Sequence, residues 1–448
     1  MTELENILKN EFPESSLILD REAMEPYSRD ETPEKLVFYP DAVLRPENTE
    51  EIKKLLHLAN TYNFPVIPRG AGTSRCGGPL PVRGGVVVST ERMKKIIDID
   101  TKNMFVLLEP GVITGEINRS LKETGLFYPP DPASIDSCSI GGNVATNAGG
   151  PHCLKYGVTR NYVYGLDVFT PDGSELNLGG KVLKNTTGYS LLNLFIGSEG
   201  TLGIFTKILL RIIPEPVYKN LVLAIFNDLN QATEGAIELL RRGVIPDALE
   251  FIDRDCVKAK KAHESELPDL KVGDYLLIEI AGFSEEEIDR YLETLGDILE
   301  NAEDILVADQ PSQMEALWNF RRGISEAIDT ENLIIPEDIV VPRNRIPDVI
   351  SMIKNIAGRR KTRIYTFGHI GDGNIHVDIV STGDESIVEE ILKIVADAGG
   401  KISGEHGIGW TKRKYLHYSR DKKEIQIMRK LKRTFDPNNI LNPDKLFI

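Results

Sequence analysis

The sequence predicts an α+β protein with two domains. Its 448 residues exceed what a single hydrophobic core usually supports. In residues 85–215, short apolar segments alternate with glycine and proline, and helical stretches interrupt them. Further along, a strand followed by a helix occurs first in residues 221–243 and again in residues 275–299. This repeated order predicts an antiparallel sheet with helices on one face.

The N-terminal region predicts a helical segment, an extended segment and then a second helix. Residues 1–40 should contain the first two. The second helix is expected over residues 48–63, where Asn48 or Thr49 can cap its N-terminus. Its apolar residues recur at helical spacing on one face: Ile52, Leu55, Leu56 and Ala59. A short strand over residues 64–67 should follow.

Charge and composition exclude several classes of protein. The formal net charge is −15 and no basic stripe interrupts it, so nucleic acid is not expected as a partner. No apolar run approaches the ~18 residues of a transmembrane helix, and residues 1–12 are too acidic for a signal peptide. The four cysteines form no CxxC pair, which indicates a reducing compartment without an iron–sulfur cluster. We therefore expect a cytoplasmic protein, with peripheral membrane association left open.

The first glycine-rich loop, RGAGTS at residues 69–74, follows the predicted short strand. In such loops, backbone N–H groups can approach phosphate oxygens closely. A nucleoside-triphosphate loop would need GxxxxGK[ST], and no such lysine follows. A Rossmann loop would open a helix, but Pro79 and Pro81 follow instead. A plain structural turn remains the alternative for this loop taken by itself.

Two further glycine-rich segments occupy residues 128–150 and 185–207. The first of them contains two Gly-Gly pairs and many small side chains, which leave room for a large flat ligand. Its polar side chains can reach the edges of such a ligand: Ser139, Asn143, Thr146 and Asn147. Because three such loops lie at strand ends, we interpret them as the binding site of a long dinucleotide laid across the first domain.

Five motifs together resemble a known group of flavoproteins. They are PRGAGTS (68–74), the segment from YPPDPAS to IGGNVATNAGG (128–150), KYGVTRNYVYGLDV (155–168), FIGSEGTLGI (195–204) and ILNPDK (440–445). In this order they are similar to the flavoprotein fold of vanillyl-alcohol oxidase and p-cresol methylhydroxylase. Within that fold, the chain resembles the D-lactate dehydrogenase/glycolate oxidase flavoprotein-subunit group, which includes D-2-hydroxyglutarate dehydrogenases.

The resemblance implies three parts of the chain. Residues 1–215 would form a two-lobed FAD-binding domain of the p-cresol methylhydroxylase (PCMH) type, which includes the N-terminal helical segment. Residues 216–412 would form a ferredoxin-like cap domain with the substrate and metal sites, and residues 413–448 would return to the FAD domain. FAD is expected to bind non-covalently, although His152 and Cys153 lie near the second glycine-rich segment.

The same resemblance implies which residues contact FAD. The first loop would surround the pyrophosphate, and the second would follow the flavin and ribityl chain. The implied contacts are Pro68, Arg69, Gly70, Ala71, Gly72, Thr73, Ser74, Pro130, Ser134, Ser139, Gly141, Gly142, Asn143, Thr146, Asn147, Gly149, Tyr156, Gly157, Glu199, Gly200, Gly203, Ile204 and Asn442.

Two of the seven histidines flank a turn in GHIGDGNIH, residues 368–376. The dipeptide Asp372-Gly373 is a strong signal for a two-residue hairpin. Such a hairpin would place His369 opposite His376, on one face, with their Cβ atoms about 5 Å apart. Two imidazoles so placed are a natural start for a metal site. A plain hairpin with two hydrogen-bonded histidines is the alternative.

A third ligand is available in SGEHGIG, residues 403–409, which contains Glu405 and His406. Metal-binding members of the resembled group carry the same two motifs, which implies His369, His376 and Glu405 as ligands. Two nitrogens and one carboxylate leave an open position, as in catalytic zinc sites, and manganese or iron would fit the same donors. The resemblance implies His406 as the general base. A third imidazole ligand or a simple flavin contact are its alternatives.

The substrate carboxylate needs a cation, and residues 317–328 offer two arginines near the start of a predicted helix. Arginine can hold a carboxylate bidentately. In related 2-hydroxyglutarate enzymes the positions of Arg321 and Ser325 touch the substrate, whereas Arg322 is expected to be solvated. Those enzymes also carry a nearby lysine, where this chain has residues 336–338, PED. This departure favours a monocarboxylate such as lactate or glycolate.

The resemblance therefore implies an FAD-dependent dehydrogenase that oxidises a D-2-hydroxy acid to the 2-oxo acid by hydride transfer to flavin. A divalent metal would polarise the substrate hydroxyl, and an external electron acceptor or redox partner protein is required. A homodimer is compatible with this interpretation. The alternatives are the flavoprotein subunit of a glycolate/lactate oxidase complex, a flavin-dependent transferase similar to alkyl-glycerone-phosphate synthases, and a non-catalytic FAD or metal-binding protein.

Overall fold

A computed structural model of the chain describes every residue except 1, 34, 264–269, 329–333 and 381–383. The chain divides into two compact units. The first unit contains Met1–Ala148, Val158–Glu215 and Glu405–Ile448, and the second contains Gly149–Gly157 and Pro216–Gly404. These ranges differ from the expected domains at two places: residues 149–157 belong to the second unit, and the return to the first unit begins at Glu405 instead of residue 413.

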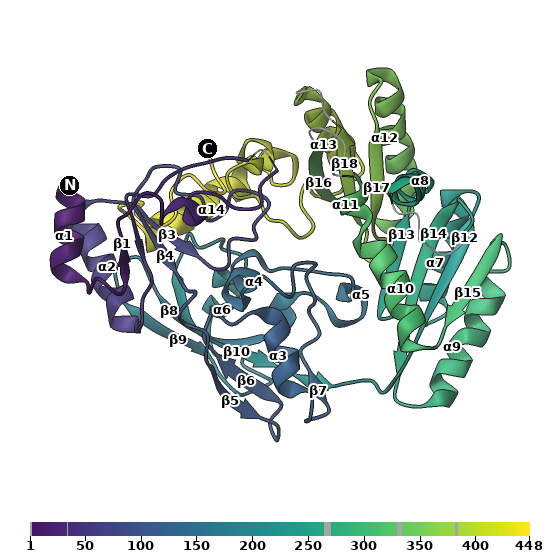
Figure 1. Ribbon diagram of the computed structural model, residues 1–448, viewed down its shortest axis with the longest axis horizontal. Helices are drawn as coiled ribbons and strands as arrows, with labels where there is room; N and C mark the ends of the chain where they lie inside the picture. The colour runs from purple at the N-terminus through teal and green to yellow at the C-terminus, as the bar shows by residue number, and fades with distance from the viewer. Residues whose placement is uncertain (1, 34, 264–269, 329–333, 381–383) are drawn as a thin grey trace. The chain divides into compact units, whose positions relative to one another are not determined.

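The first unit contains a four-stranded sheet in the order β1-β2-β4-β3 (Figure 1). Its strands are β1 (Leu17–Ile18), β2 (Ala42–Leu44), β3 (Val66–Arg69) and β4 (Val86–Ser89). Helix α2 (Thr49–Tyr62) connects β2 to β3, and the Asn48 side chain caps it by accepting from the Glu51 N–H. Its four predicted apolar residues are all fully buried, which confirms the expected helix and its buried face.

A second, antiparallel sheet of the first unit has the order β5-β6-β10-β8-β9. Its strands are β5 (Ile96–Asp100), β6 (Phe105–Leu108), β8 (Val163–Phe169), β9 (Glu175–Gly179) and β10 (Ile204–Arg211), and β7 (Leu126–Phe127) pairs separately with β11 (Ile213–Pro214). The other helical segments of this unit are α1 (Glu3–Glu11), η1 (Glu25–Tyr27), α3 (Thr114–Leu121), α4 (Ile140–Thr146), η2 (Thr159–Asn161), α6 (Leu191–Phe195), η4 (Lys412–Tyr418) and α14 (Lys422–Phe435).

The second unit is built on a seven-stranded sheet in which every pairing is antiparallel. Its order is β15-β12-β14-β13-β17-β18-β16. The strands are β12 (Tyr218–Phe226), β13 (Ala248–Ile252), β14 (Asp274–Gly282), β15 (Asp304–Ala308), β16 (Ile334–Val340), β17 (Ile364–His369) and β18 (Asn374–Val380). The helices are α5 (Cys153–Tyr156), α7 (Leu229–Arg241), α8 (Arg254–His263), α9 (Glu285–Ile298), α10 (Pro311–Arg322), α11 (Ile324–Ile328), η3 (Arg343–Arg345), α12 (Ile346–Arg360) and α13 (Ser386–Asp397).

Helices cover both faces of this sheet, whereas the sequence predicted helices on one face. Apolar residues of α8, α10 and α11 share a core cluster with Ile225 of β12. A Cβ at Gly235 of α7 would instead lie 4.0 Å from the ring of Phe226, which faces the opposite side because strand side chains alternate. All nine residues of β14 are buried, so this interior strand needs cover on both sides. The predicted α+β class is confirmed, and so is the antiparallel sheet predicted for the second domain.

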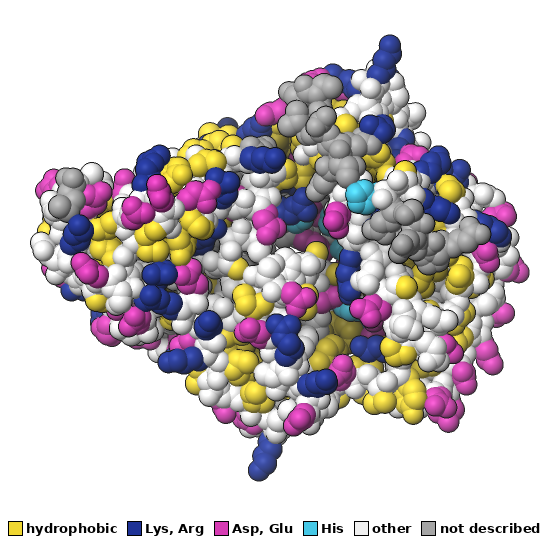
Figure 2. Space-filling model, viewed as in Figure 1, with side chains coloured by type: hydrophobic (Ala, Val, Ile, Leu, Met, Phe, Trp, Pro, Cys, Tyr) yellow, Lys and Arg dark blue, Asp and Glu magenta, His cyan; other side chains and the backbone are white. Residues whose placement is uncertain are grey.

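On the face drawn in Figure 2, acidic and basic side chains of the described residues are interspersed. Among the described residues, the helices are too short or too polar to cross a membrane.

Candidate functional site

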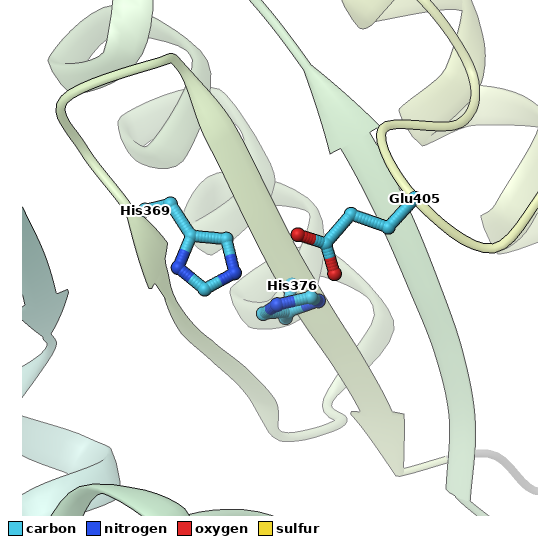
Figure 3. A group of neighbouring side chains, drawn as sticks. All are labelled: His369, His376 and Glu405. Carbon is cyan, nitrogen blue, oxygen red and sulfur yellow. The ribbon is translucent and has the colours of Figure 1, made fainter. Parts of the chain in front are cut away.

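The two predicted histidines lie on neighbouring strands of the second unit, β17 and β18 (Figure 3). His369 pairs with Asn374, and His376 pairs with Phe367. Four residues, 370–373, therefore connect the strands, and the predicted two-residue turn with His369 opposite His376 is wrong. The N–H groups of Asp372 and Gly373 both donate to the His369 carbonyl, which makes the longer turn.

The register error does not separate the two imidazoles. A shift of two residues returns each side chain to the same face of a strand. The ring centroids of His369 and His376 lie 5.3 Å apart, with the rings nearly perpendicular at 85°. The hairpin thus presents both rings on one face, as the sequence predicted. The two histidines are diagonal neighbours on adjacent strands and do not pair directly with each other.

Glu405 completes a group of three metal-ligating side chains. The ring nitrogens of His369 and His376 and a carboxylate oxygen of Glu405 all lie within 4.8 Å of one another. In Figure 3 the Glu405 carboxylate points toward both rings. Two imidazole nitrogens and one carboxylate oxygen are a donor set typical of catalytic zinc, with bonds of about 2 Å. The residues present therefore fit a divalent cation.

His369 is held by a buried carboxylate that sequence reasoning missed. Its Nδ1 lies 2.5 Å from Oε1 of Glu250, which is fully buried and pairs with His369 across β13 and β17. Burial raises the pKa of Glu250, but His369 and Arg321 outweigh it and lower that pKa below its ordinary value. A carboxylate on the far nitrogen of a ligating histidine is the usual support of a metal site. The sequence feature that could have identified Glu250 is a charged residue within the otherwise apolar strand ALEFI.

Arg321, the predicted substrate clamp, is bound to the same carboxylate. Its Nε lies 2.9 Å and its Nη2 2.7 Å from Oε2 of Glu250, and its guanidinium covers the Phe367 ring at 4.9 Å. It lies in the last turn of α10, not near a helix start as expected. Arg322 is exposed beside Trp318, and Ser325 is half-buried on α11.

The segment that carries Glu405 and His406 is held at its start by another buried carboxylate. Asp338 of β16 is fully buried. Its Oδ2 accepts from Ser403 Oγ at 3.1 Å and from the Gly404 N–H at 2.9 Å. Its Oδ1 accepts from the Asn374 side-chain amide at 2.7 Å. Since Glu405 follows Gly404 directly, Asp338 fixes its position beside the histidine hairpin.

Glu199, predicted as a cofactor contact, holds the other end of this segment. Its carboxylate accepts from the N–H groups of Ile408 at 2.9 Å and Gly409 at 2.6 Å. Burial raises the pKa of Glu199, and these two N–H groups lower it only in part. Between the two held ends, His406 is half-buried, and its carbonyl accepts from Cys76 Sγ at 3.1 Å.

The glycine-rich loops of the first unit lie against one another. The Ala71 N–H donates to Ser139 Oγ at 3.3 Å, and a Cβ at Gly70 would lie 2.2 Å from that oxygen. The third loop joins them through the Glu199 N–H, which donates to the Ala145 carbonyl at 2.7 Å. Three loops distant in sequence therefore form one surface, as the dinucleotide interpretation requires.

The buried polar atoms without a hydrogen-bond partner among the described residues include Nη1 of Arg69 in the first loop, Oγ of Ser198 in the third loop and Oδ1 of Asn442. A buried donor without a partner is costly unless a ligand supplies one, so Arg69 fits an anionic group such as a pyrophosphate. Asn442 also donates to the carbonyls of Gly78 and Glu199, at 3.1 and 2.8 Å. The loops therefore fit the predicted dinucleotide.

Several predicted cofactor contacts have other partners in the structure. Asn143 is buried and donates to Thr114 Oγ1 at 2.7 Å, and a Cβ at Gly203 would lie 2.4 Å from Val168, so this glycine allows close packing. Tyr156 belongs to the second unit together with Gly149 and Gly157. Its hydroxyl donates to Asp247 at 2.6 Å.

The remaining predicted contacts lie in the first unit: Pro68, Gly72, Thr73, Ser74, Pro130, Ser134, Gly141, Gly142, Thr146, Asn147, Gly200 and Ile204. Within this set, Asn147 ends helix α4 with a left-handed backbone at φ 55°, a conformation that asparagine tolerates better than most residues. Gly72 also has positive φ, at 84°.

Comparison with known proteins matches both halves of the chain. A model of the C-terminal domain of FAD-linked oxidases matches residues 215–446, and a model of an FAD binding domain matches residues 40–179. The glycolate oxidase subunit GlcD of Bacillus subtilis is 38% identical over 94% of this chain and 92% of its own. The D-lactate dehydrogenase of Anaerostipes hadrus is 36% identical over 91% and 89%, and the D-2-hydroxyglutarate dehydrogenase of Stutzerimonas stutzeri is 32% identical over 98% of both.

Solved structures show the same fold at lower identity. p-Cresol methylhydroxylase with bound substrate superimposes with a TM-score of 0.78 at 17% identity, covering 97% of this chain and 94% of that one. An alkyldihydroxyacetonephosphate synthase gives 0.78 at 20% identity, covering 99% and 86%. The PCMH-type fold predicted for the FAD-binding region is thereby confirmed.

Proposed function

Because this chain belongs to the FAD-linked oxidase family and is an FAD-dependent oxidoreductase, we propose that it oxidises a D-2-hydroxy acid to the 2-oxo acid. The observation that carries this proposal is the convergence of His369, His376 and Glu405 in one donor group. The relatives cited above are named for glycolate, D-lactate and D-2-hydroxyglutarate, which are all 2-hydroxy acids. A hydroxyl next to a carboxylate suits a site that offers a divalent cation.

The ligand set would be His369, His376 and Glu405, with zinc as the proposed ion and manganese or iron as ions that accept the same donors. When bound, FAD supplies the acceptor for the two electrons that leave the substrate carbon, and the ion supplies the positive charge that acidifies the substrate hydroxyl. FAD is proposed to bind non-covalently in the loops of the first unit. An external acceptor or redox partner protein then removes the electrons.

His406 is proposed as the general base that takes the proton from the substrate hydroxyl. It follows Glu405 directly, in a segment held at both ends by the buried carboxylates of Asp338 and Glu199. A base must lie within hydrogen-bond reach of the proton that it removes. Because Gly404, two residues earlier, is bound to Asp338 in the second unit, His406 stays close along the chain to the donor group, which supports this role.

The substrate carboxylate is proposed to contact Arg321, with Ser325 nearby on the following helix. Because Nε and Nη2 of this guanidinium are bound to Glu250, Nη1 would contact the substrate carboxylate. At residues 336–338 the chain supplies acidic side chains, and Asp338 is engaged in holding the Glu405 segment. A second substrate carboxylate would find no cation there, which supports a monocarboxylate such as lactate or glycolate.

An anaerobic titration of the purified flavoprotein tests this proposal. We expect D-lactate or glycolate to bleach the flavin absorbance. D-2-hydroxyglutarate should do so at least about tenfold less efficiently, because its second carboxylate would be left without a cation; a factor of ten corresponds to ~1.4 kcal/mol. Treatment with a chelator should abolish bleaching, and zinc or manganese should restore it. Bleaching that survives complete metal removal would contradict the metal-dependent mechanism, and no bleaching with any acid would contradict the substrate class.

A second proposal is that the chain works as the flavoprotein subunit of a larger oxidase. The relative with 38% identity is itself named as a subunit of glycolate oxidase. Affinity purification from the native host should then recover a second protein in fixed proportion. Full turnover of the isolated chain with a soluble dye, and no such protein, would contradict it.

A further inference from the structure

Glu250 joins two groups that the proposed reaction uses separately. One carboxylate oxygen lies 2.5 Å from Nδ1 of His369, a proposed metal ligand. The other lies 2.9 Å from Nε and 2.7 Å from Nη2 of Arg321, the proposed contact of the substrate carboxylate. Glu250 has no exposed surface. Both of its oxygens are therefore committed to these two partners.

The position of this carboxylate is set by the sheet. Glu250 lies on β13, between β14 and β17, where it pairs with Leu277 on one side and with His369 on the other. A residue in the interior of a sheet has little freedom to shift along or across it. The glutamate, unlike a loop residue, thus holds a fixed distance to the hairpin and to helix α10 that carries Arg321.

The chemistry of the contact determines which nitrogen of His369 can bind an ion. An ionised carboxylate only accepts hydrogen bonds, so the Nδ1 that faces it must carry the proton. The lone pair of the imidazole is then on Nε2, the nitrogen available to a metal. The guanidinium, whose Nε and Nη2 both contact Oε2, keeps the carboxylate ionised inside the protein, because a buried charge needs a close opposite charge.

We propose that Glu250 is a positioning residue that fixes the ligating tautomer of His369 and orients Arg321, and so couples metal affinity to binding of the substrate carboxylate. The part concerning Arg321 rests on the proposed function. The part concerning His369 rests only on the donor group and its geometry. The two parts can therefore be tested apart.

The test is Glu250→Gln, with zinc affinity measured by competition against a chromophoric chelator and no substrate present. If the amide carbonyl stays on Arg321, the amide NH2 faces Nδ1 of His369 and favours the tautomer that cannot ligate. We expect zinc affinity to fall by about 10–100-fold, as for other residues that support metal-ligating histidines. FAD content should be unchanged, and added zinc should restore turnover at a correspondingly higher concentration.

Glu279→Gln is the matched control. Glu279 is also a buried carboxylate on this sheet, and it accepts from Trp318 Nε1 at 2.7 Å and lies 3.1 Å from Nε2 of His152. Neither partner is a proposed ligand, so zinc affinity should match that of the parent. Arg321→Lys keeps a positive charge beside Glu250 but loses the forked guanidinium, so KM for the hydroxy acid should rise while zinc still binds.

Loss of one member of a buried ion pair can prevent folding, because it leaves the other charge unpaired. The double variant Glu250→Leu/Arg321→Met removes both charges and leaves Nδ1 of His369 without an acceptor, so it should fold with weakened zinc affinity. Parental zinc affinity in either folded Glu250 variant would overturn the proposal, and so would an equal loss in Glu279→Gln. If the parent binds zinc but oxidises no hydroxy acid, the proposed function fails while the tautomer assignment is still tested.

Discussion

Replacing His369 or His376 with alanine is expected to remove the metal and to lower kcat/KM by about 10³-fold or more, while FAD stays bound. A bound cation contributes several kcal/mol to the stabilisation of developing charge, and ~1.4 kcal/mol corresponds to a factor of ten in rate. Each alanine removes one nitrogen from the donor group of three. The flavin should remain because the glycine-rich loops belong to the first unit and the hairpin to the second.

The measurement combines metal analysis, flavin absorbance and turnover on the same preparations. His417→Ala is the control, because His417 is exposed and contacts the Lys414 carbonyl in the first unit. It should keep metal, flavin and activity. Full turnover in both His369→Ala and His376→Ala would show that the reaction does not use this donor group.

Replacing His406 with alanine should slow the chemical step and leave both cofactors in place. General-base catalysis contributes typically about 10²–10⁴-fold, so kcat for flavin reduction should fall by that factor with little change in KM. A base acts in its unprotonated form, and its activity is lost as the pH falls. The acidic limb of the pH–rate profile should therefore be present in the parent and absent from His406→Ala.

Stopped-flow reduction of the flavin over a range of pH, with zinc content measured in parallel, checks this expectation. If His406→Ala also loses the metal, the imidazole is a ligand and the base is another group. An unchanged rate of flavin reduction would remove His406 from the mechanism. His57→Ala serves as the control, because His57 is an exposed residue of α2 that lies against Gly173.

Features that depend on neighbours along the chain could be predicted from the sequence. Helix α2 has its cap at Asn48 and its buried stripe where predicted, because a cap and a 3.6-residue period are local properties. The placement of His369 and His376 on one face also followed from sequence. Side chains alternate between the two faces of a strand, so an error of two residues in register leaves both histidines on the same face. The three glycine-rich loops were likewise recognised from composition and motif.

The length of the hairpin loop and the packing of helices on both faces of the sheet could be learned only from the tertiary structure. The hairpin loop has four residues, and the His369 carbonyl accepts hydrogen bonds from two N–H groups within it. The dipeptide Asp372-Gly373 does not by itself determine this loop length. The sheet of the second unit carries helices on both faces, and its interior strand β14 is therefore buried throughout. Whether helices cover one face of an apolar strand or both depends on the position of the strand in the sheet. The order of the strands could not be predicted from the sequence.

The supports of the candidate site also depended on tertiary structure. Glu250 is distant in sequence from both His369 and Arg321, and only the strand order brings β13 beside β17. Sequence reasoning assigned Arg321 to the substrate without seeing that a buried carboxylate already holds it. Asp338 was noted only as a departure from a related motif, yet it fixes the entry to Glu405. Sequence motifs predict the residues that contact ligands. The residues that orient those side chains depend on tertiary contacts between distant parts of the chain.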